Sequence, residues 1–360
     1  MAASIHKKND IVFDRYRIEE LVGEGGMQQV YRACDESLER IVAVKVPKNL
    51  SARKRFRRSA EVSAKVTHPN VAKTLDFLPE QTIEYLVEEF IEGSDLQFRL
   101  DTEFLQLDPH LAAHLVHHLA KGIAACHEIG VVHRDLKPSN IMISADSSFT
   151  EIKITDFGIA KMAGAEIDQA IEEGDESITA SATVVGALPY MAPEVIQDNN
   201  NVGPACDVWA TGAILYHVLV GQRPFGSGLI AIPKILKRDL PKRESVLKAK
   251  PQFQKLVSEL WGIVEECLNL DPQKRIAAGQ LVSRLSEICY STAPRMEGEI
   301  YSYKAGTGDW GFIKSEECEN CFFHADSFYG GKPSNGQKVN FAFFPGSPSP
   351  RAFPVLPLRE

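Results

Sequence analysis

Residues 133–140 read HRDLKPSN, and residues 156–158 read DFG. Together they place a carboxylate, Asp135, ahead of an amide, Asn140, and a second carboxylate, Asp156. Asn140 and Asp156 supply the hard oxygen ligands that Mg²⁺ prefers, and Asp135 can orient an acceptor hydroxyl group. Phosphoryl transfer from ATP needs metal ions that neutralise developing charge and a base near the acceptor. The two segments therefore carry the residue types of a phosphoryl-transfer site.

These motifs are long, ordered and almost gap-free, and through them the chain resembles the eukaryotic-type Ser/Thr protein kinases, especially their bacterial branch. The resemblance implies an α+β bilobal protein kinase fold, with a β-rich N-lobe and a helical C-lobe. It also implies that ATP with Mg²⁺ or Mn²⁺ is the phosphate donor. A protein Ser or Thr would accept the γ-phosphate, and the protein would autophosphorylate.

The resemblance gives roles to four residues of these motifs. Asp135 would orient the acceptor hydroxyl as a base, and Lys137 would stabilise the moving phosphoryl group. Asn140 and Asp156 would hold the metal. The position of Lys137 is typical of Ser/Thr rather than Tyr kinases, and His133 is expected to be a structural residue of the catalytic loop.

The pattern along the chain fits a kinase domain at residues 14–290. Apolar alternation predicts strands within residues 16–43 and 71–91, on either side of an amphipathic helix at residues 53–67. Longer helical patterns follow at residues 111–127, 205–220 and 253–268. A small β-rich lobe thus precedes a larger helical lobe.

A second domain is expected at the C-terminal end. Residues 291–297 read STAPRME, a short polar linker, and residues 298–360 carry short apolar or aromatic runs punctuated by Gly and Pro. This pattern predicts a small all-β barrel. At 360 residues with 44% hydrophobic content, the chain is long enough for two domains with packed cores.

Composition and the N-terminal sequence favour a soluble protein of the cytoplasm. The seven Cys residues are scattered and odd in number, which predicts no disulfide framework and fits a reducing compartment. The first eight residues lack the apolar core of a signal peptide. No apolar run approaches the roughly 18 residues of a membrane span. The net charge of −8 argues against a strongly basic nucleic-acid binder, although local basic patches stay open.

A glycine-rich segment, GEGGMQQV, occupies residues 23–30 between two predicted strands. Glycines let the backbone fold over the phosphates of ATP and offer N–H donors, whereas a simple hairpin turn is the alternative. The segment precedes Lys45 at a distance that favours ATP binding. The third glycine of the family's loop falls on Gln28. The resemblance implies these ATP-binding residues in the loop and the following strand: Gly23, Glu24, Gly25, Gly26, Val30, Ala43 and Lys45.

Lys45 would bind the α- and β-phosphates, and three later residues complete the expected nucleotide site. Glu89 and Ile91 belong to a segment that resembles the hinge, whose backbone hydrogen-bonds adenine. Asp95 matches the ribose-contacting position, with a helix cap as the alternative.

The carboxylate partner of Lys45 departs from the family pattern. The family's helix glutamate falls on Ser59, and Glu61 lies about 200° around the helix from that position, on the wrong face. Glu88 stands just before the hinge, where the family usually has an apolar residue. We hypothesise that Glu88 partly replaces the missing carboxylate; the alternative is an exposed glutamate.

The segment from Asp156 to Glu194 is expected to be the activation segment. Kinases with an Arg directly before the catalytic Asp, here Arg134, are commonly switched by a phosphate that pairs with it. Thr179 and Ser181 resemble the paired autophosphorylation sites of bacterial kinases, with unmodified hydroxyls as the alternative.

Three further positions in the kinase motifs have structural consequences. Ala187 stands where the family usually has a Thr that touches the catalytic residues, which predicts weaker substrate alignment. Glu194 is expected to pair with Arg275. Asp207 is expected to begin a helix that supports the catalytic loop.

The C-terminal segment carries aromatic residues at alternate positions, Trp310 and Phe312, then Phe322 and His324. Period-two spacing puts each pair on one face of a sheet, and exposed aromatics form a stacking platform for unpaired bases. The segment resembles the cold-shock domain, an OB-type barrel, which implies binding of single-stranded RNA or DNA.

This second resemblance has departures. Two of the family's aromatic positions hold Ser302 and Ala325, and the segment holds six Lys/Arg against seven Asp/Glu. Protein contacts or inhibition of the kinase lobe by the barrel are therefore alternatives.

Other site types receive weak support. His110, His114, His117 and His118 share a helix at a spacing that could bind a metal, and Cys318, Cys321 and His324 invite a zinc interpretation. Cys321 and His324 would face opposite sides of one strand, which disfavours zinc. For the whole chain, a weakly active or inactive kinase-shaped scaffold is the alternative to catalysis, and the resemblance leaves room for a transient homodimer.

Overall fold

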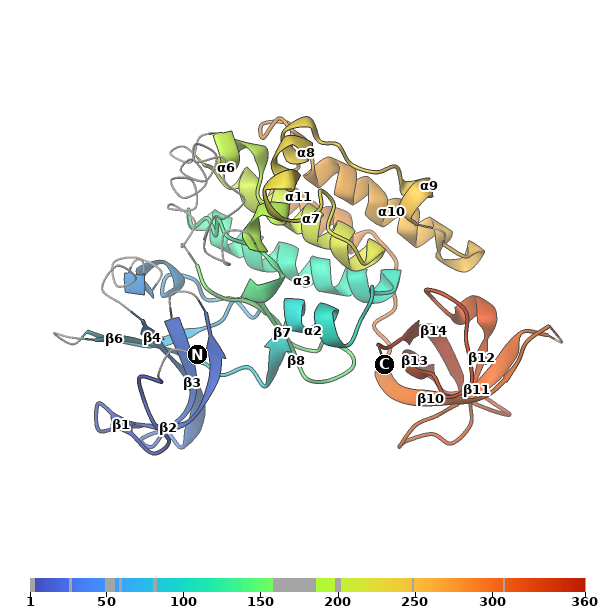
Figure 1. Ribbon diagram of the computed structural model, residues 1–360, viewed down its shortest axis with the longest axis horizontal. Helices are drawn as coiled ribbons and strands as arrows, with labels where there is room; N and C mark the ends of the chain where they lie inside the picture. Colours follow the sequence, from blue (N-terminus) through green and yellow to red (C-terminus); the bar gives the residue numbers. More distant parts are fainter. Residues whose placement is uncertain are drawn as a thin grey trace.

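The computed structural model describes residues 4–25, 28–48, 56–57, 60–79, 83–157, 186–197, 202–247, 249–306 and 308–359. The chain forms a β-rich N-lobe, a helical lobe and a C-terminal barrel. In Figure 1 the N-lobe, in blue, and the barrel, in orange and red, lie on the left and right, each against the helical lobe. This arrangement agrees with the protein kinase fold followed by a small all-β domain.

The N-lobe is a six-stranded antiparallel sheet of order β1-β2-β3-β4-β6-β5. Its strands alternate buried and half-exposed residues with period two, most regularly in β3. Residues 56–57 and 60–63 are helical, within the range where a helix is predicted. The strands are β1 Ile11–Val12, β2 Tyr16–Glu24, β3 Gln28–Asp35, β4 Arg40–Pro47, β5 Thr74–Pro79 and β6 Glu84–Glu89.

The helical lobe is built around α3 (Pro109–Glu128) and α7 (Ala205–Val220). α3 begins with Asp108 as its N-cap and Pro109 in its first turn, an arrangement that satisfies free backbone N–H groups. α7 is buried on nearly all sides, as an apolar helix of a lobe's centre should be.

Shorter elements complete this lobe. A three-stranded sheet lies beside the catalytic loop and consists of β7 Gly93–Asp95, β8 Ile141–Ser144 and β9 Ile152–Ile154. The other helices are α2 Leu96–Thr102, α6 Pro193–Gln197, α8 Ala231–Lys237, α9 Arg243–Val246, α10 Pro251–Cys267 and α11 Ala278–Ser286, with 3₁₀ turns η1 Pro138–Asn140, η3 Leu188–Tyr190 and η4 Gly228–Ile230. The three long helices predicted from periodicity are confirmed to within two residues.

The C-terminal domain is a closed five-stranded barrel of order β10-β11-β12-β14-β13, and β13 returns to β10. β10 begins at Arg295, which pairs with Ala342, so three residues assigned to the linker at 291–297 belong to the barrel. Strand pairing with β13 draws these polar residues into the sheet. The elements are β10 Arg295–Lys304, β11 Trp310–Lys314, β12 Cys321–His324, η5 Ala325–Ser327, β13 Lys338–Phe344 and β14 Arg351–Pro357.

The barrel is docked on the helical lobe. Tyr329 and Leu356 of the barrel belong to the same buried apolar cluster as the core of that lobe. Phe353 stacks on Phe253 of α10 with ring centroids 5.4 Å apart and an interplanar angle of 5°. The two domains therefore share a packed interface.

Among the residues that the structure describes, no helix has both the length and the apolar character needed to cross a lipid bilayer.

Candidate active site

The catalytic loop is held by the first turn of α7. Asp207 accepts hydrogen bonds from the backbone N–H groups of His133 (2.9 Å) and Arg134 (2.8 Å), and His127 lies 2.8 Å from it. Burial would raise the pKa of Asp207, but hydrogen bonds from His127 and the loop hold it below its usual range. Arg134 has a φ of 66°, a left-handed backbone that is rare outside glycine and that this anchoring maintains. The expected support of the loop by Asp207 is confirmed.

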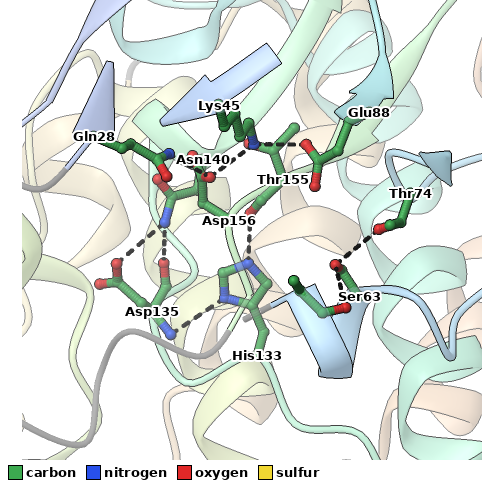
Figure 2. A network of polar contacts seen from close by, with 11 residues as sticks. Gln28, Lys45, Ser63, Thr74, Glu88, His133, Asp135, Asn140, Thr155 and Asp156 are labelled. Atoms are coloured by element: carbon green, nitrogen blue, oxygen red, sulfur yellow. Dashed lines mark hydrogen bonds and ion pairs between the residues drawn. The ribbon is translucent and has the colours of Figure 1, made fainter. Parts of the chain in front are cut away.

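Asp135, Lys137 and Asn140 converge within the loop. Lys137 Nζ lies 2.9 Å from Asp135 Oδ2, and Asn140 Nδ2 lies 3.2 Å from the same oxygen and 2.7 Å from the Asp135 carbonyl oxygen. His133 Nε2 donates to the Thr155 carbonyl at 2.9 Å, so its Nδ1 accepts from the Asp135 N–H at 3.2 Å. Figure 2 shows the contacts of Asp135 with Asn140 and His133, and that of His133 with Thr155. Asp135 is thereby held at its carboxylate oxygen Oδ2 by Lys137 and Asn140, and at its backbone N–H by His133.

Asp156 joins the catalytic loop to the N-lobe. Its φ is 59°, again left-handed, and the next side chain, Phe157, is buried with its ring 4.7 Å from that of His133. Asp156 Oδ1 accepts hydrogen bonds from Lys45 Nζ at 2.8 Å and from Gln28 Nε2 at 2.9 Å. Backbone strain of this kind persists only where surrounding contacts enforce it, which is typical of functional sites.

Lys45 has two carboxylate partners. Besides Asp156, its Nζ lies 2.6 Å from Glu88 Oε2, and the Lys45 and Glu88 side chains are 6% and 5% exposed. Figure 2 shows Lys45 between the two. The alternative of an exposed Glu88 is therefore wrong.

The charges in this trio follow from burial and contact. Burial would lower the pKa of Lys45, but the charges of Asp156 and Glu88 hold it above its ordinary value. Burial would raise the pKa of Asp156, which the Lys45 charge instead holds below its usual range. Burial raises the pKa of Glu88 despite the Lys45 charge. Asp156 is thus the more strongly ionised of the two carboxylates.

The helix beside this trio presents small residues. Glu61 is exposed, as its position around the helix predicts. Ser63 is 2% exposed, and its hydroxyl lies 2.8 Å from that of Thr74 on β5. Ser59, where the family places its glutamate, lies outside the described residues.

The expected nucleotide-binding residues lie along one side of the N-lobe sheet and its connection to the helical lobe. Gly23 and Glu24 end β2, Val30 lies on β3 and Ala43 on β4, while Gly25 follows β2 directly. Glu24 Oε1 pairs with Lys48 at 2.7 Å. Gly26 lies outside the described residues.

The connection between the lobes is also defined. β6 ends at Glu89, whose carboxylate pairs with Lys153 at 2.9 Å, and Ile91 is buried just beyond. Asp95 Oδ1 accepts the Phe98 N–H at 3.0 Å and caps α2, so the helix-cap alternative is confirmed for that oxygen. A role for Asp95 at the ribose stays a prediction.

Asn140 and Asp156 offer the hard oxygen donors that a divalent metal such as Mg²⁺ prefers. The Asn140 amide nitrogen donates to Asp135, which leaves its oxygen as the atom that could meet a metal, and Asp156 supplies carboxylate oxygen. The described residues contain no cluster of three His, Cys, Asp or Glu able to enclose a metal. Mg²⁺ suits such a site because it takes its other ligands from phosphate and water.

The acceptor side of the site contains a guanidinium nitrogen without a hydrogen-bond partner among the residues that the structure describes. Arg134 Nε is buried without a hydrogen-bond partner among the described residues. A small pocket beside it is lined by Asp135, Ala187, Tyr190 and Met191. Thr179 and Ser181 lie outside the described residues.

The expected structural ion pair of this lobe is confirmed. Arg275, whose side chain is fully buried, contacts Glu194 through Nη1 at 2.6 Å and Nη2 at 3.1 Å. The pair ties the end of the activation segment to the loop before α11.

The barrel presents the predicted aromatic face. Trp310 lies opposite His324 and Phe312 opposite Phe322 in the β11–β12 pair. All four are half-exposed, whereas the alternate strand residues Gly311, Ile313, Cys321 and Phe323 are buried. The Phe312 and Phe322 ring centroids are 5.9 Å apart. Cys321 points into the barrel core, opposite to His324.

Sequence reasoning missed three residues of this face and one of the cleft. Tyr301, 45% exposed, stacks on Phe312 at 6.3 Å because the register shifts at residues 300–302, and such an irregularity re-aims a side chain. Lys304 lies over Trp310 at 4.7 Å, and Arg351 lies over Phe322 at 5.4 Å. In the cleft, the Gln28–Asp156 bond was missed, although Gln28 stood out as a departure from the loop pattern.

The four clustered His residues bond to different neighbours. His110 accepts from the Ser291 N–H, His114 contacts the Phe149 carbonyl, His117 contacts Tyr290, and His118 contacts Asn70. Each therefore has a hydrogen-bonding role in packing.

Comparison with known proteins gives one consistent result. The family model described as protein kinase domain matches residues 16–285. The serine/threonine-protein kinase PknB of Mycobacterium tuberculosis (strain H37Rv) is 32% identical over 272 residues, which is 73% of this chain and 41% of PknB. PknL of the same strain is 32% identical over 252 residues, 68% of this chain and 59% of PknL.

A solved structure agrees. The crystal structure of Rad53 1–466 in complex with AMP-PNP matches with a TM-score of 0.58 and 25% identity, over 76% of this chain and 65% of that one. The chain thus spans about two fifths of the length of PknB.

Proposed function

The chain belongs to the protein kinase family, and we propose that it is an active Ser/Thr protein kinase that transfers the γ-phosphate of ATP to protein Ser or Thr and autophosphorylates. The observation that carries this proposal is that the Lys45–Asp156 pair lies beside the Asp135–Asn140 pair of the catalytic loop, as Figure 2 shows. The relatives PknB and PknL carry the name serine/threonine-protein kinase, which supports the same substrate class.

The residues divide the work of phosphoryl transfer. Lys45 contacts the α- and β-phosphates, and the Asn140 and Asp156 oxygens hold Mg²⁺ or Mn²⁺, which neutralises charge on the phosphates when bound. Asp135 accepts the proton of the acceptor hydroxyl. Lys137, held 2.9 Å from Asp135, stabilises the charge of the moving phosphoryl group.

Adenine lies against the segment from Glu89 to Ile91, beneath Val30 and Ala43. The backbone of Gly23, Glu24, Gly25 and Gly26 covers the phosphates, and the Asp95 carboxylate faces the ribose. This placement extends the family resemblance residue by residue.

Thr179 and Ser181 are proposed autophosphorylation sites. Arg134 supports this because its Nε has no hydrogen-bond partner among the described residues, and a guanidinium binds phosphate well. Ala187, which has no hydroxyl beside Asp135, is consistent with a modest basal rate.

The test is incubation of the purified protein with labelled ATP and Mg²⁺ beside an Asp135→Asn variant. We expect label on the wild type alone, with phosphopeptides that contain Thr179 or Ser181. Binding of ATP with Mg²⁺ but no label on the wild type would instead favour the kinase-shaped scaffold.

The barrel has a second candidate function, binding of single-stranded RNA or DNA as a cold-shock-like, OB-type domain. Its strand order, with β12 parallel to β14, fits the OB type, and the strands that carry aromatics are those that bind oligonucleotides in such barrels. The observation that favours this function is the aromatic face flanked by Lys304 and Arg351. Stacked bases and cationic side chains are what such binding uses.

Fluorescence anisotropy with a labelled single-stranded oligonucleotide tests this function. Phe312→Ala and Phe322→Ala should each weaken binding, because each stacked base contributes about 1–3 kcal/mol. Phe98→Ala is the matched control, since Phe98 is 52% exposed on α2 of the helical lobe. Equal binding by all three variants would leave the barrel with a role in protein contacts.

A further inference from the structure

We infer that Glu88 is a positioning residue that holds Lys45 from within the β-sheet, so that the place of the lysine does not depend on the helix that contains residues 60–63. The inference rests on the proposed kinase function, in which Lys45 contacts the phosphates of ATP. In kinases generally, a glutamate on that helix pairs with the lysine, and movement of the helix controls the pair.

Glu88 and Lys45 are fixed to each other by strand pairing. β4 and β6 are hydrogen-bonded neighbours, with Lys45 opposite Leu86 and Ala43 opposite Glu88. Glu88 is therefore the diagonal neighbour of Lys45 on the same face of the sheet, within reach of a long side chain. Their contact of 2.6 Å joins two side chains that the sheet itself holds in register.

The described part of the helix offers Lys45 no carboxylate. Glu61 is the one acidic residue at positions 56–57 and 60–63, and it is exposed. The inward positions are occupied by Ala60 and by Ser63, whose hydroxyl is bonded to Thr74. Figure 2 shows the Ser63–Thr74 pair on one side of Glu88 and Lys45 on the other.

A second carboxylate matters because Asp156 has two demands on it. Lys45 binds the Asp156 carboxylate, and the proposed metal would bind the same group. A buried ammonium group without a partner lowers the stability of the folded state. Glu88 makes the second contact of Lys45, so Lys45 would keep a carboxylate partner when Asp156 held a metal. Loss of the Glu88 charge should therefore strengthen the hold of Lys45 on Asp156 and weaken metal binding.

The experiment uses the full chain and four variants: Glu88→Gln, Glu88→Asp, Glu61→Gln and Ala60→Gly. Binding of AMP-PNP is measured by calorimetry over a series of Mg²⁺ concentrations, and kcat and KM for ATP are measured in parallel. Thermal unfolding checks that each variant is folded.

We expect Glu88→Gln to need about tenfold more Mg²⁺ for half-maximal AMP-PNP binding and to lose about tenfold or more in kcat, because Lys45 and the metal then compete for one carboxylate. Glu88→Asp, which keeps the charge, should recover part of both losses. Glu61→Gln is the matched control of an exposed glutamate. It and Ala60→Gly, which weakens the helix, should stay within about twofold of the wild type.

Two results would overturn the inference alone, with the wild type active. One is a Glu88→Gln variant with wild-type Mg²⁺ dependence and kcat. The other is a loss of kcat and of Mg²⁺ affinity with Ala60→Gly as large as that expected for Glu88→Gln. That result would mean that the position of Lys45 depends on the helix. A wild type that neither binds AMP-PNP nor acquires label would instead refute the proposed function, and the inference with it.

Discussion

Arg295 of the barrel forms an ion pair with Asp108 of the helical lobe, with 2.6 Å between Nη2 and Oδ2 and side chains 5% and 0% exposed. The other Asp108 oxygen caps α3 by accepting the N–H groups of His110 and Leu111. Arg295 Nε also donates to Asn340 Oδ1 at 2.6 Å. One carboxylate thus joins the barrel to the start of the longest helix described in the kinase domain.

This relationship predicts that the barrel stabilises the kinase domain. Arg295→Met should lower the free energy of unfolding by about 3–5 kcal/mol, because it leaves a buried carboxylate without its cation. Equilibrium unfolding in urea measures the change. Lys274→Met is the control, since Lys274 and Asp271 form a pair 75% and 43% exposed. Its effect should stay below about 1 kcal/mol, and an equally small effect for Arg295→Met would contradict the prediction.

Substitution of Gln28 should change the Mg²⁺ requirement in the direction opposite to substitution of Glu88. Its amide occupies Asp156 Oδ1, so Gln28→Ala should lower the Mg²⁺ concentration for half-maximal AMP-PNP binding by about two- to fivefold, the range that one hydrogen bond supports. Gln97→Ala removes a comparable amide that bonds to Asp101 on the surface, and serves as control. A higher Mg²⁺ requirement for Gln28→Ala would show that Gln28 assists the metal instead.

The free energy of unfolding should fall in acid because of two His residues of α3, the buried His117 and the half-buried His118. Burial lowers the pKa of His117 and of His118 to about 4, from 6.5 in the unfolded chain. Between these values the unfolded state binds more protons, so the free energy of unfolding falls as the pH falls from 6.5 to 4. The groups that face them are Lys121, Tyr290, Ser286, Asn70, His68 and His114.

The contribution of one histidine can be isolated. Between pH 6.5 and 5, His118 should account for at most about 2 kcal/mol of this loss, and His118→Gln should make the slope of stability against pH shallower. Urea unfolding at several pH values measures the slope. An unchanged slope in His118→Gln would mean that this side chain is protonated equally well in the folded state.

Removal of either cation beside the aromatic face should change how oligonucleotide binding depends on salt. Lys304→Ala and Arg351→Ala should each weaken oligonucleotide binding and reduce the slope of log K against log salt by about 0.7, the value for one phosphate contact on a single strand. Anisotropy titrations at three salt concentrations measure it, with Lys274→Ala as control. A weaker affinity with an unchanged slope would assign these residues to ring packing alone.

Much of the site could be predicted because its functional residues lie close together in short segments of the sequence. Asp135, Lys137 and Asn140 lie within six residues, so the local turn brings them together once Asp207 anchors the loop. α7 occupies the predicted residues because a long apolar pattern between helix-ending signals leaves few other conformations. The alternating aromatic residues of β11 and β12 share a face because side chains of a strand alternate between its two faces, which is also a local property.

The rest depended on contacts between distant segments. The sequence alone determined the kinase motifs, the long helices and the presence of a second, all-β domain. Only the tertiary structure decided that Glu88 faces Lys45, that Gln28 reaches Asp156, and that Arg295 enters the helical lobe. The physical reason is that side-chain direction on a strand depends on register with its neighbours, and domain contacts depend on packing, neither of which a local pattern contains.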